Sequence, residues 1–399
     1  ARVEGMIDSG RVRACYTPGL GGIAEAVMKM CLGNGLGFEF AHDVTDEELF
    51  GYCYAGFLLE VEHAEGGERV VGKVTAERMI SRGSDRIELS ELHKAYEEKL
   101  EPVFPTRTDE RRSAPETLSG ALRKSCAPAV RTVRPTVLIP VFPGTNCEYD
   151  SAKAVEDAGA NARIVVINNR TADGISFSSE AFSHAVGESQ AIFIPGGFSG
   201  GDEPDGSGKF ITAFFRGAEV RDAVTDLLDR RGGLMCGICN GFQALIKLGL
   251  VPYGKIIDTD ESCPTLTYNT IARHQSRIVR TRIVSNSSPW LSLMNVGDVV
   301  NVPISHGEGR FIASDELMQS LIENGQVATQ YVDLDGYATY DIRYNPNGSL
   351  LAVEGITSPD GRVFGKMGHS ERIGNGLYKN VPGCYDIRMF ESAVRFFKG

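Results

Sequence analysis

The chain has 399 residues, which is long enough for two or three domains that each bury a core of their own. Its net charge of −11 argues against a nucleic-acid partner, and the lack of an apolar stretch of bilayer length argues against a membrane partner. Nine scattered cysteines without a signal-like N-terminus indicate a reducing cytoplasm and not a disulfide framework. We therefore expect a cytoplasmic protein.

The first segment, residues 1–105, predicts an α+β unit. A helix bounded by glycine is expected over 22–30, a strand at the apolar run 56–61, and a last helix over 90–100. The sequence starts at Ala1 without an initiator methionine, in a stretch that looks like the interior of a folded unit. We therefore expect the chain to be the C-terminal part of a larger enzyme.

A weakly patterned segment follows at residues 106–134. Proline and arginine recur there with little apolar periodicity, which is typical of an extended connector that wraps a surface or moves. The pattern changes again at residue 135, where short apolar runs begin to alternate with amphipathic ones. The sequence thus predicts a connector between the α+β segment and a larger domain at residues 135–399.

This larger domain predicts an α/β fold with a mostly parallel sheet. Buried strands are expected at 137–141, 164–167 and 191–194, with a helix at 151–158 between the first two. Active sites of such folds lie in loops at the carboxyl ends of the strands, where helix N-termini and backbone donors converge. The informative loops follow the first, third and fourth strands, and they are residues 143–148, residues 195–202 and the turn that contains Cys239.

Cys239 is the candidate nucleophile because it lies in the motif Gly-Ile-Cys-Asn-Gly between an apolar strand and an amphipathic helix. Glycines two residues on either side permit the tight nucleophile elbow, and the N-terminus of the helix stabilises a thiolate. Cys236, three residues earlier in the apolar run, is expected to be packed and inert. A redox Cys-x-x-Cys pair is the competing interpretation, although such motifs open a helix at the first cysteine. No Cys/His cluster has the spacing of structural zinc, so no metal is expected.

Thiolate attack on a carbonyl creates an oxyanion, which needs preorganised backbone donors. The glycine-rich loop after the third strand meets this need, and the N–H of Gly197 paired with that of Asn240 is a candidate oxyanion hole.

The general base is expected to be a histidine with an acidic partner that sets its tautomer. Two histidines have a glutamate two residues later: His306 with Glu308, and His369 with Glu371. Residues i and i+2 of an extended segment point to the same side, so either pair qualifies and the residues alone do not rank them. The other histidines lack this local pattern and are expected to be structural or solvated; they are His42, His63, His93, His184 and His274.

Several motifs occur together in one order: FPGTNCE, PGGFSGGDE, GICNGFQ, SHGEGR, YNPNGS, GITSPDGR and GHSER. With them, residues 135–399 resemble the class I glutamine amidotransferase domain at the C-terminus of large phosphoribosylformylglycinamidine synthases. Residues 1–105, with ACYTPGLGGIAEAV and GNGLGFEF, resemble the C-terminal subdomain of that family's second, aminoimidazole ribonucleotide synthetase-like domain. The resemblance implies a flavodoxin-like glutaminase domain preceded by an α+β half-domain.

The resemblance also implies roles for the candidate residues. Cys239 would be the nucleophile, His369 its base and Glu371 the residue that orients His369, which resolves the tie between the histidines. His306 and Glu308 would line the glutamine pocket or a domain contact, and Gln243 would help to bind glutamine. Many family members have proline after the catalytic histidine, whereas Ser370 follows it here, which bears on the rigidity of the loop.

The implied function is glutamine hydrolysis that supplies ammonia for the ATP-dependent conversion of formylglycinamide ribonucleotide to its amidine in purine biosynthesis. Glutamine would be the substrate and upstream synthetase domains the partners. The glutaminase domain would need no cofactor, whereas the complete enzyme would use ATP and Mg²⁺. Two alternatives stay open: a catalytically silent docking or regulatory fragment, and a glutaminase or cysteine hydrolase that serves another acceptor.

Overall fold

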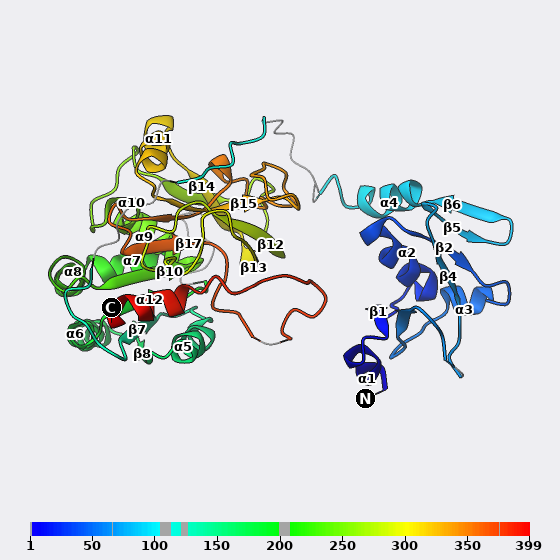
Figure 1. The fold of residues 1–399 in the computed structure, drawn as a ribbon, viewed down its shortest axis with the longest axis horizontal. Coiled ribbons are helices and arrows are strands. Elements are labelled where there is room, and N and C mark those ends of the chain that lie inside the picture. Colours follow the sequence, from blue (N-terminus) through cyan, green and yellow to red (C-terminus); the bar gives the residue numbers. More distant parts are fainter. Residues whose placement is uncertain (1, 66, 104–112, 121–126, 199–207, 375) are drawn as a thin grey trace. The chain divides into compact units, whose positions relative to one another are not determined.

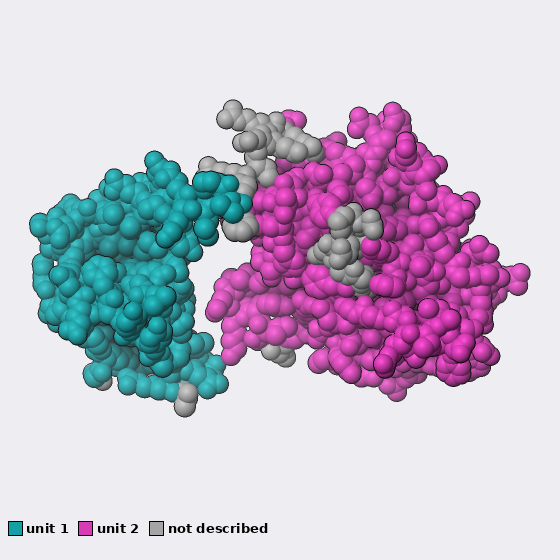
Figure 2. Space-filling view, turned by 180° about the vertical axis from the view of Figure 1, so that it is seen from behind, with its two compact units in different colours: residues 1–106 teal, residues 107–399 magenta. Residues whose placement is uncertain are grey.

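The computed structural model describes residues 2–65, 67–103, 113–120, 127–198, 208–374 and 376–399. Its contacts divide the chain into two compact units, residues 1–106 and 107–399, which Figure 2 distinguishes by colour. Each unit has a hydrophobic core of its own, as expected for segments of this length. Parts of two predicted segments lie outside the described residues: 106–112 and 121–126 of the connector, and 199–202 of the glycine-rich loop.

Unit 1 is an α+β unit. Its described residues form a sheet with the strand order β4-β2-β5-β6 and a separate pair, β1-β3. The helices are α1 (Arg2–Asp8), α2 (Gly22–Asn34), α3 (Asp46–Phe50) and α4 (Leu89–Glu98). The strands are β1 (Val12–Tyr16), β2 (Gly37–Phe40), β3 (Leu58–Val61), β4 (Gly72–Thr75), β5 (Met79–Arg82) and β6 (Asp85–Glu88). The two predicted helices are α2 and α4, and the predicted strand is β3 (Figure 1).

Local chemistry explains the ends of these elements. Helix α2 stops at Gly35, which adopts φ of 67° and donates its N–H to the carbonyl of Cys31, the left-handed cap that glycine favours. Helix α3 begins at Thr45, whose hydroxyl accepts the N–H of Glu48 while the Glu48 carboxylate accepts the N–H of Thr45. These caps satisfy backbone groups that the helices leave open.

Unit 2 has an α/β fold with one large central sheet, which confirms the predicted fold class. Within the described residues the strand order is β13-β12-β15-β16-β17-β10-β9-β7-β8. The strands of this sheet are β7 (Thr136–Val141), β8 (Asn161–Val166), β9 (Ala191–Ile194), β10 (Leu234–Ile238), β12 (Gln275–Ile283), β13 (Val299–His306), β15 (Val327–Val332), β16 (Val353–Thr357) and β17 (Val363–Lys366). A separate pair is formed by β11 (Thr265–Tyr268) and β14 (Glu308–Ile312).

Helices connect and cover these strands (Figure 1). They are α5 (Glu148–Asp157), α6 (Ala172–Glu188), α7 (Lys209–Arg216), α8 (Ala218–Thr225), the π-helix η1 (Asp226–Arg230), α9 (Asn240–Leu248), α10 (Leu250–Tyr253), α11 (Asp315–Glu323), the 3-10 helix η2 (Leu350–Ala352) and α12 (Met389–Lys398). Among the helices of the described residues, none combines the length and the apolar character that a membrane span requires.

The sheet of unit 2 has two halves of different direction. Strands β17, β10, β9, β7 and β8 run parallel to one another, and this half contains the predicted strands. Strands β13, β12, β15 and β16 extend the sheet with antiparallel pairings, and β16 also pairs antiparallel with β17. Every residue of β10 is buried, as expected for a strand covered on both faces. Helix α9, which follows β10, packs on β10 and β17.

The described part of the connector packs against unit 2. The side chain of Leu118 is buried, and its N–H donates to the amide oxygen of Gln330 at 2.8 Å. The N–H of Gly120 donates to the carbonyl of Val284 at 2.8 Å. Residues 113–120 therefore belong structurally to unit 2.

Candidate active site

Cys239 lies at the turn between β10 and α9 in a strained backbone conformation, with φ of 52° and ψ of −106°. Such a conformation in a residue other than glycine costs about 1–3 kcal/mol and persists only where the surroundings hold it. A Cβ on Gly237 would lie 2.5 Å from the carbonyl carbon of Gly241, and one on Gly241 would overlap the carbonyl oxygen of Ile194. The two glycines are therefore required by packing, and the predicted strand-turn-helix elbow is confirmed.

Backbone hydrogen bonds fix this turn on both sides. The N–H of Cys239 donates to the carbonyl of Lys366 in the neighbouring strand at 2.9 Å, and the carbonyl of Cys239 accepts the N–H of Gln243 at 3.0 Å. Cys239 is therefore the N-cap residue of α9, which is the place predicted for the nucleophile.

Cys236 has a different environment although it lies only three residues earlier. It is fully buried in β10, and burial raises the pKa of its thiol well above the usual value. The prediction that Cys236 is packed inside the strand is confirmed. Since Cys239, and not Cys236, precedes the helix, the geometry differs from that of a redox Cys-x-x-Cys motif.

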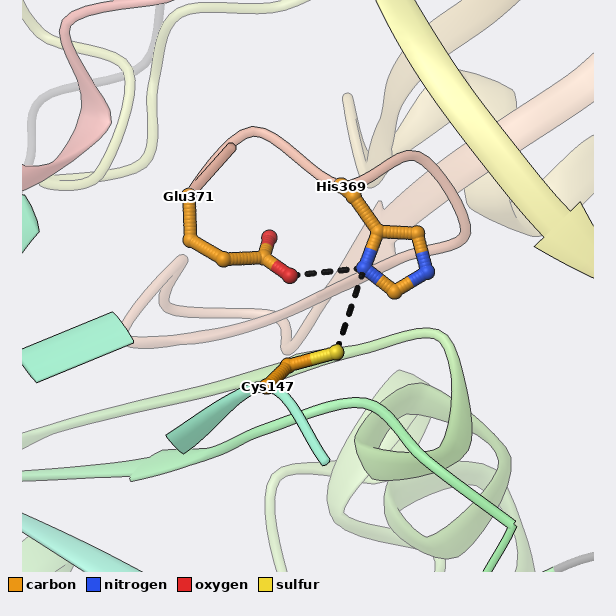
Figure 3. A group of neighbouring side chains, drawn as sticks. All are labelled: Cys147, His369 and Glu371. Atoms are coloured by element: carbon orange, nitrogen blue, oxygen red, sulfur yellow. Dashed lines mark hydrogen bonds and ion pairs between the residues drawn. The ribbon is translucent and has the colours of Figure 1, made fainter. Parts of the chain in front are cut away.

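His369 and Glu371 form a buried pair in the loop after β17. The Nδ1 atom of His369 lies 2.6 Å from Oε1 of Glu371 (Figure 3), and the backbone N–H of His369 donates to the carbonyl of Pro303 at 2.9 Å. Burial lowers the pKa of His369, but the charge of Glu371 and hydrogen bonds to the thiols of Cys147 and Cys239 outweigh burial. Burial raises the pKa of Glu371, but the charge of His369 and the hydrogen bond to it outweigh burial. The pKa of His369 is thus held well above its usual value and that of Glu371 below it, which defines an imidazolium–carboxylate pair.

The elbow and this pair meet at Gly196 in the loop after β9. A Cβ on Gly196 would lie 2.7 Å from Cε1 of His369 and 3.4 Å from Cβ of Cys239. Hydrogen bonding and charge interaction with Cys239 also raise the pKa of His369. The structure therefore brings Cys239, His369 and Glu371 together, and glycine at 196 leaves the space that they need.

The other predicted residues surround this group. Gly197, adjacent to Gly196, adopts φ of 148°, and a Cβ there would lie 2.7 Å from Cα of Thr145.

Asn240 is the first residue of α9, and its side-chain amide donates to Oε1 of Gln243 at 2.9 Å. Nε2 of Gln243 donates to the carbonyl of Glu308 at 2.8 Å. Both ends of the Gln243 amide thus bond protein groups, and its expected contact with glutamine stays a prediction.

His306 is close to the group but is held differently from His369. Its Nδ1 lies 3.2 Å from the amide oxygen of Asn269, and its Nε2 has no hydrogen-bond partner within the described residues. Burial, together with electrostatic repulsion from His369 and His274, lowers its pKa to about 3. His306 is therefore a neutral imidazole, which distinguishes the two candidate histidines.

Cys147 is a neighbour of the group that the sequence did not single out. Its thiol lies 3.8 Å from Nδ1 of His369 (Figure 3) and accepts a hydrogen bond from the guanidinium of Arg372 at 3.0 Å. Its position in the loop after β7, one of the informative loops, was the sequence signal that could have identified it.

His274 also lies nearer to the site than expected. Its Nε2 lies 3.0 Å from the hydroxyl of Ser305, and its ring lies 5.9 Å from that of Phe198.

Cys147, His369 and Glu371 are also the residue types that bind zinc, and their candidate ligand atoms lie within 4.8 Å of one another. The argument from sequence spacing missed this group because its members come from distant segments. In the structure the carboxylate engages the imidazole, and the guanidinium of Arg372 engages the thiol. We interpret these contacts as a site for proton transfer.

The chain is similar to a known class of protein, the glutamine amidotransferases. A family model of the CobB/CobQ-like glutamine amidotransferase domain matches residues 134–397, and the chain belongs to this family. The chain is similar to the phosphoribosylformylglycinamidine synthase subunit PurQ of Chlorobium chlorochromatii, with 34% identity over 267 residues, 66% of this chain and 98% of that protein. The same subunit of Methanococcus maripaludis is 36% identical over 257 residues, 64% of this chain and 88% of that protein. A solved structure of PurLQS from Thermotoga maritima covers 66% of this chain and all of that one, with 25% identity and a TM-score of 0.49.

Proposed function

We propose that this chain is the glutaminase part of a phosphoribosylformylglycinamidine synthase and that it hydrolyses glutamine through Cys239, His369 and Glu371. The observation that carries the proposal is the Glu371-bound imidazolium of His369 beside the strained Cys239 elbow. The similarity of two thirds of the chain to PurQ subunits supports the acceptor pathway. A role in purine biosynthesis agrees with the expected cytoplasmic location.

The reaction begins when the Cys239 thiolate attacks the carboxamide carbon of glutamine. The resulting oxyanion would accept hydrogen bonds from the backbone N–H groups of Gly197, in the loop after β9, and of Asn240, the first residue of α9. The imidazolium of His369 then gives its proton to the leaving nitrogen, so that ammonia departs and a thioester forms. Glu371 holds the imidazole in the orientation that this transfer requires.

The second half of the reaction hydrolyses the thioester and returns the enzyme to its starting state. His369, now neutral, takes a proton from a water molecule as the water attacks the thioester carbon. Glutamate leaves, and the Cys239 thiolate and the imidazolium are restored. The net reaction converts glutamine and water to glutamate and ammonia, and the three side chains supply a nucleophile, an acid–base group and an orienting charge without a cofactor.

Ammonia is then used in the complete enzyme, where ATP and Mg²⁺ would act at a synthetase site. We infer that unit 1 is the C-terminal part of a synthetase-like domain of that enzyme, because its motifs resemble that family and it lies outside the matched residues 134–397. We assign no role in ATP binding to the site residues described above. The acceptor would be formylglycinamide ribonucleotide.

Mass spectrometry of the intact chain after incubation with a glutamine-derived chloroketone tests the nucleophile. The wild-type chain and Cys236→Ala should each gain one label, because Cys236 is buried in β10, whereas Cys239→Ala should gain none. An unlabelled wild-type chain would overturn the proposal in favour of a catalytically silent docking or regulatory piece.

The acceptor is tested in the complete enzyme. Cys239→Ala should lose glutamine-dependent formation of the amidine and keep the reaction with added ammonium, because only the ammonia source is damaged. Glutamine hydrolysis without any amidine formation would point to a glutaminase that serves another acceptor.

A further inference from the structure

A fully buried ion pair lies behind the candidate active site. Nζ of Lys366, the last residue of β17, lies 3.0 Å from Oε1 of Glu354 in β16, and both side chains have no exposed surface. An ion pair without solvent costs desolvation free energy, so its presence is weak evidence of a stabilising role. The hydrogen bonds of this pair show which part of the site it holds in place.

Lys366 uses each of its three donors on a different acceptor. Besides Glu354, the ammonium donates to the carbonyl of Gly368 at 2.9 Å and to the hydroxyl of Ser370 at 3.0 Å. These two residues flank His369 on either side. Lys366 therefore holds the backbone of the residue before His369 and the side chain of the residue after it.

Glu354 bonds the same loop as Lys366. Its Oε1 accepts the N–H of Gly368 at 2.6 Å, and its Oε2 accepts the hydroxyl of Thr329 in β15. A Cβ on Gly368 would lie 3.0 Å from Oε1 of Glu354, so glycine lets the carboxylate approach. The loop before His369 is thus bound by both members of the ion pair.

The backbone of Lys366 reaches the other half of the site. Its carbonyl accepts the N–H of Cys239 at 2.9 Å, so one residue contacts the nucleophile elbow through its backbone and the histidine loop through its side chain. Its neighbour Ser370 stands where many family members have proline. The Ser370 hydroxyl accepts from Lys366 and its N–H donates to Gly368, which are two bonds that proline lacks.

We propose that Lys366, paired with Glu354, is a positioning residue that fixes His369 relative to Cys239 through the loop at Gly368 and Ser370. The proposal rests on the glutaminase function proposed above. It assigns the rigidity of the histidine loop to this buried network, which we name the lysine clamp: Lys366, Glu354, Gly368 and Ser370. Among the described residues, the side chains of Lys366, Glu354 and Ser370 bond one another, Gly368 and Thr329, and not the thiol of Cys239 or the imidazole of His369. Loss of the clamp should therefore slow the reaction without weakening the binding of glutamine.

The test measures the maximal inactivation rate, kinact, and the inactivator constant, KI, of the full chain with the glutamine-derived chloroketone. The main variant is the double substitution Lys366→Met and Glu354→Gln, which removes both buried charges together and so avoids leaving one unpaired. We expect kinact to fall about tenfold or more, because small misplacements of reacting groups have large effects, while KI stays within about twofold. Ser370→Ala, which removes one acceptor, should lower kinact by roughly two- to fivefold.

A matched control lies at the start of the same strand. Arg362 and Asp360 form an ion pair at 2.6 Å just before β17, and Arg362 also donates to the carbonyl of Leu228. The double substitution Arg362→Met and Asp360→Asn should lower the unfolding temperature and leave kinact within about twofold. This separates positioning from a general loss of stability.

The outcomes distinguish the two proposals. A wild-type chain without any label would overturn the glutaminase function and the clamp with it. Labelling of a folded clamp double variant at the wild-type kinact would overturn the clamp alone. If that double variant does not fold, Ser370→Ala decides, and an unchanged kinact in Ser370→Ala overturns the clamp.

Discussion

Two segments of this chain have the same local pattern and opposite chemistry. In one, His306 is followed two residues later by Glu308; in the other, His369 is followed by Glu371. The His369 imidazole bonds the glutamate of its own segment, and its pKa is held well above the usual value. The His306 imidazole instead faces Asn269, and its pKa falls to about 3.

The difference lies in the surroundings. Both imidazoles are buried, and burial lowers the pKa of each. His369 gains the charge of Glu371 and two nearby thiols, whereas His306 gains a neutral amide and the repulsion of two other histidines. A carboxylate within hydrogen-bond reach thus decides which imidazole carries a proton, and the sequence spacing does not.

The largest expected effect comes from exchanging the two histidines for asparagine one at a time. His369→Asn should lower kcat for glutamine hydrolysis by the complete enzyme, measured as glutamate formation, by roughly 10²- to 10⁴-fold, the usual contribution of a general acid–base group. His306→Asn should leave this kcat within a few-fold and raise KM for glutamine by at most about tenfold, because a neutral imidazole can contribute contacts but no proton. Equal losses of kcat in both variants would contradict the assignment of different roles to the two histidines.

A smaller effect is expected on stability in Glu371→Gln, and it depends on pH. The pKa of Glu371 is below its ordinary 4.5, so its contribution is present above pH 4.5 and is lost as pH falls through the folded value. The pKa of His369 is above its ordinary 6.5, so its contribution is complete below pH 6.5 and is lost as pH rises through the folded value. The wild-type advantage should therefore peak between pH 4.5 and 6.5, at about 1.5–3 kcal/mol for a charged hydrogen bond.

Thermal unfolding of both chains across pH 4 to 9 measures this advantage, with Glu308→Gln as the matched control in the other segment. We expect the control to lack the maximum between the two ordinary pKa values, because His306 stays neutral throughout that range. A difference between wild type and Glu371→Gln that does not change with pH would contradict an imidazolium–carboxylate pair.

The smallest expected effect concerns Cys147, which contacts His369 and Arg372. A contact of 3.8 Å to sulfur is weak, so Cys147→Ala should change kinact by only about twofold and leave one label per chain. Cys147→Ser, which keeps an acceptor for the guanidinium, should be closer still to wild type. A loss of labelling in Cys147→Ala with full labelling of Cys239→Ala would reassign the nucleophile.

Local sequence patterns predicted much of the parallel half of the sheet. Strands β7, β9 and β10 and helix α9 appear where apolar runs and glycines placed them, because each depends on residues close in the chain. The antiparallel half was not predicted in detail. Strands β12, β13, β15 and β16 pair across long separations, and such pairing follows from which faces must be covered in three dimensions.

Residues close together in the chain were enough to predict the elbow, since Gly237 and Gly241 admit a turn that side chains would block, and to find two histidines with a glutamate two residues away. Which histidine is charged became clear from the folded chain, because the charge depends on the partner that each imidazole contacts after folding. The folded chain also revealed the lysine clamp and Cys147. Their contacts join neighbouring strands and distant loops, and electrostatic interactions act over the few ångströms between atoms, whatever the separation along the chain.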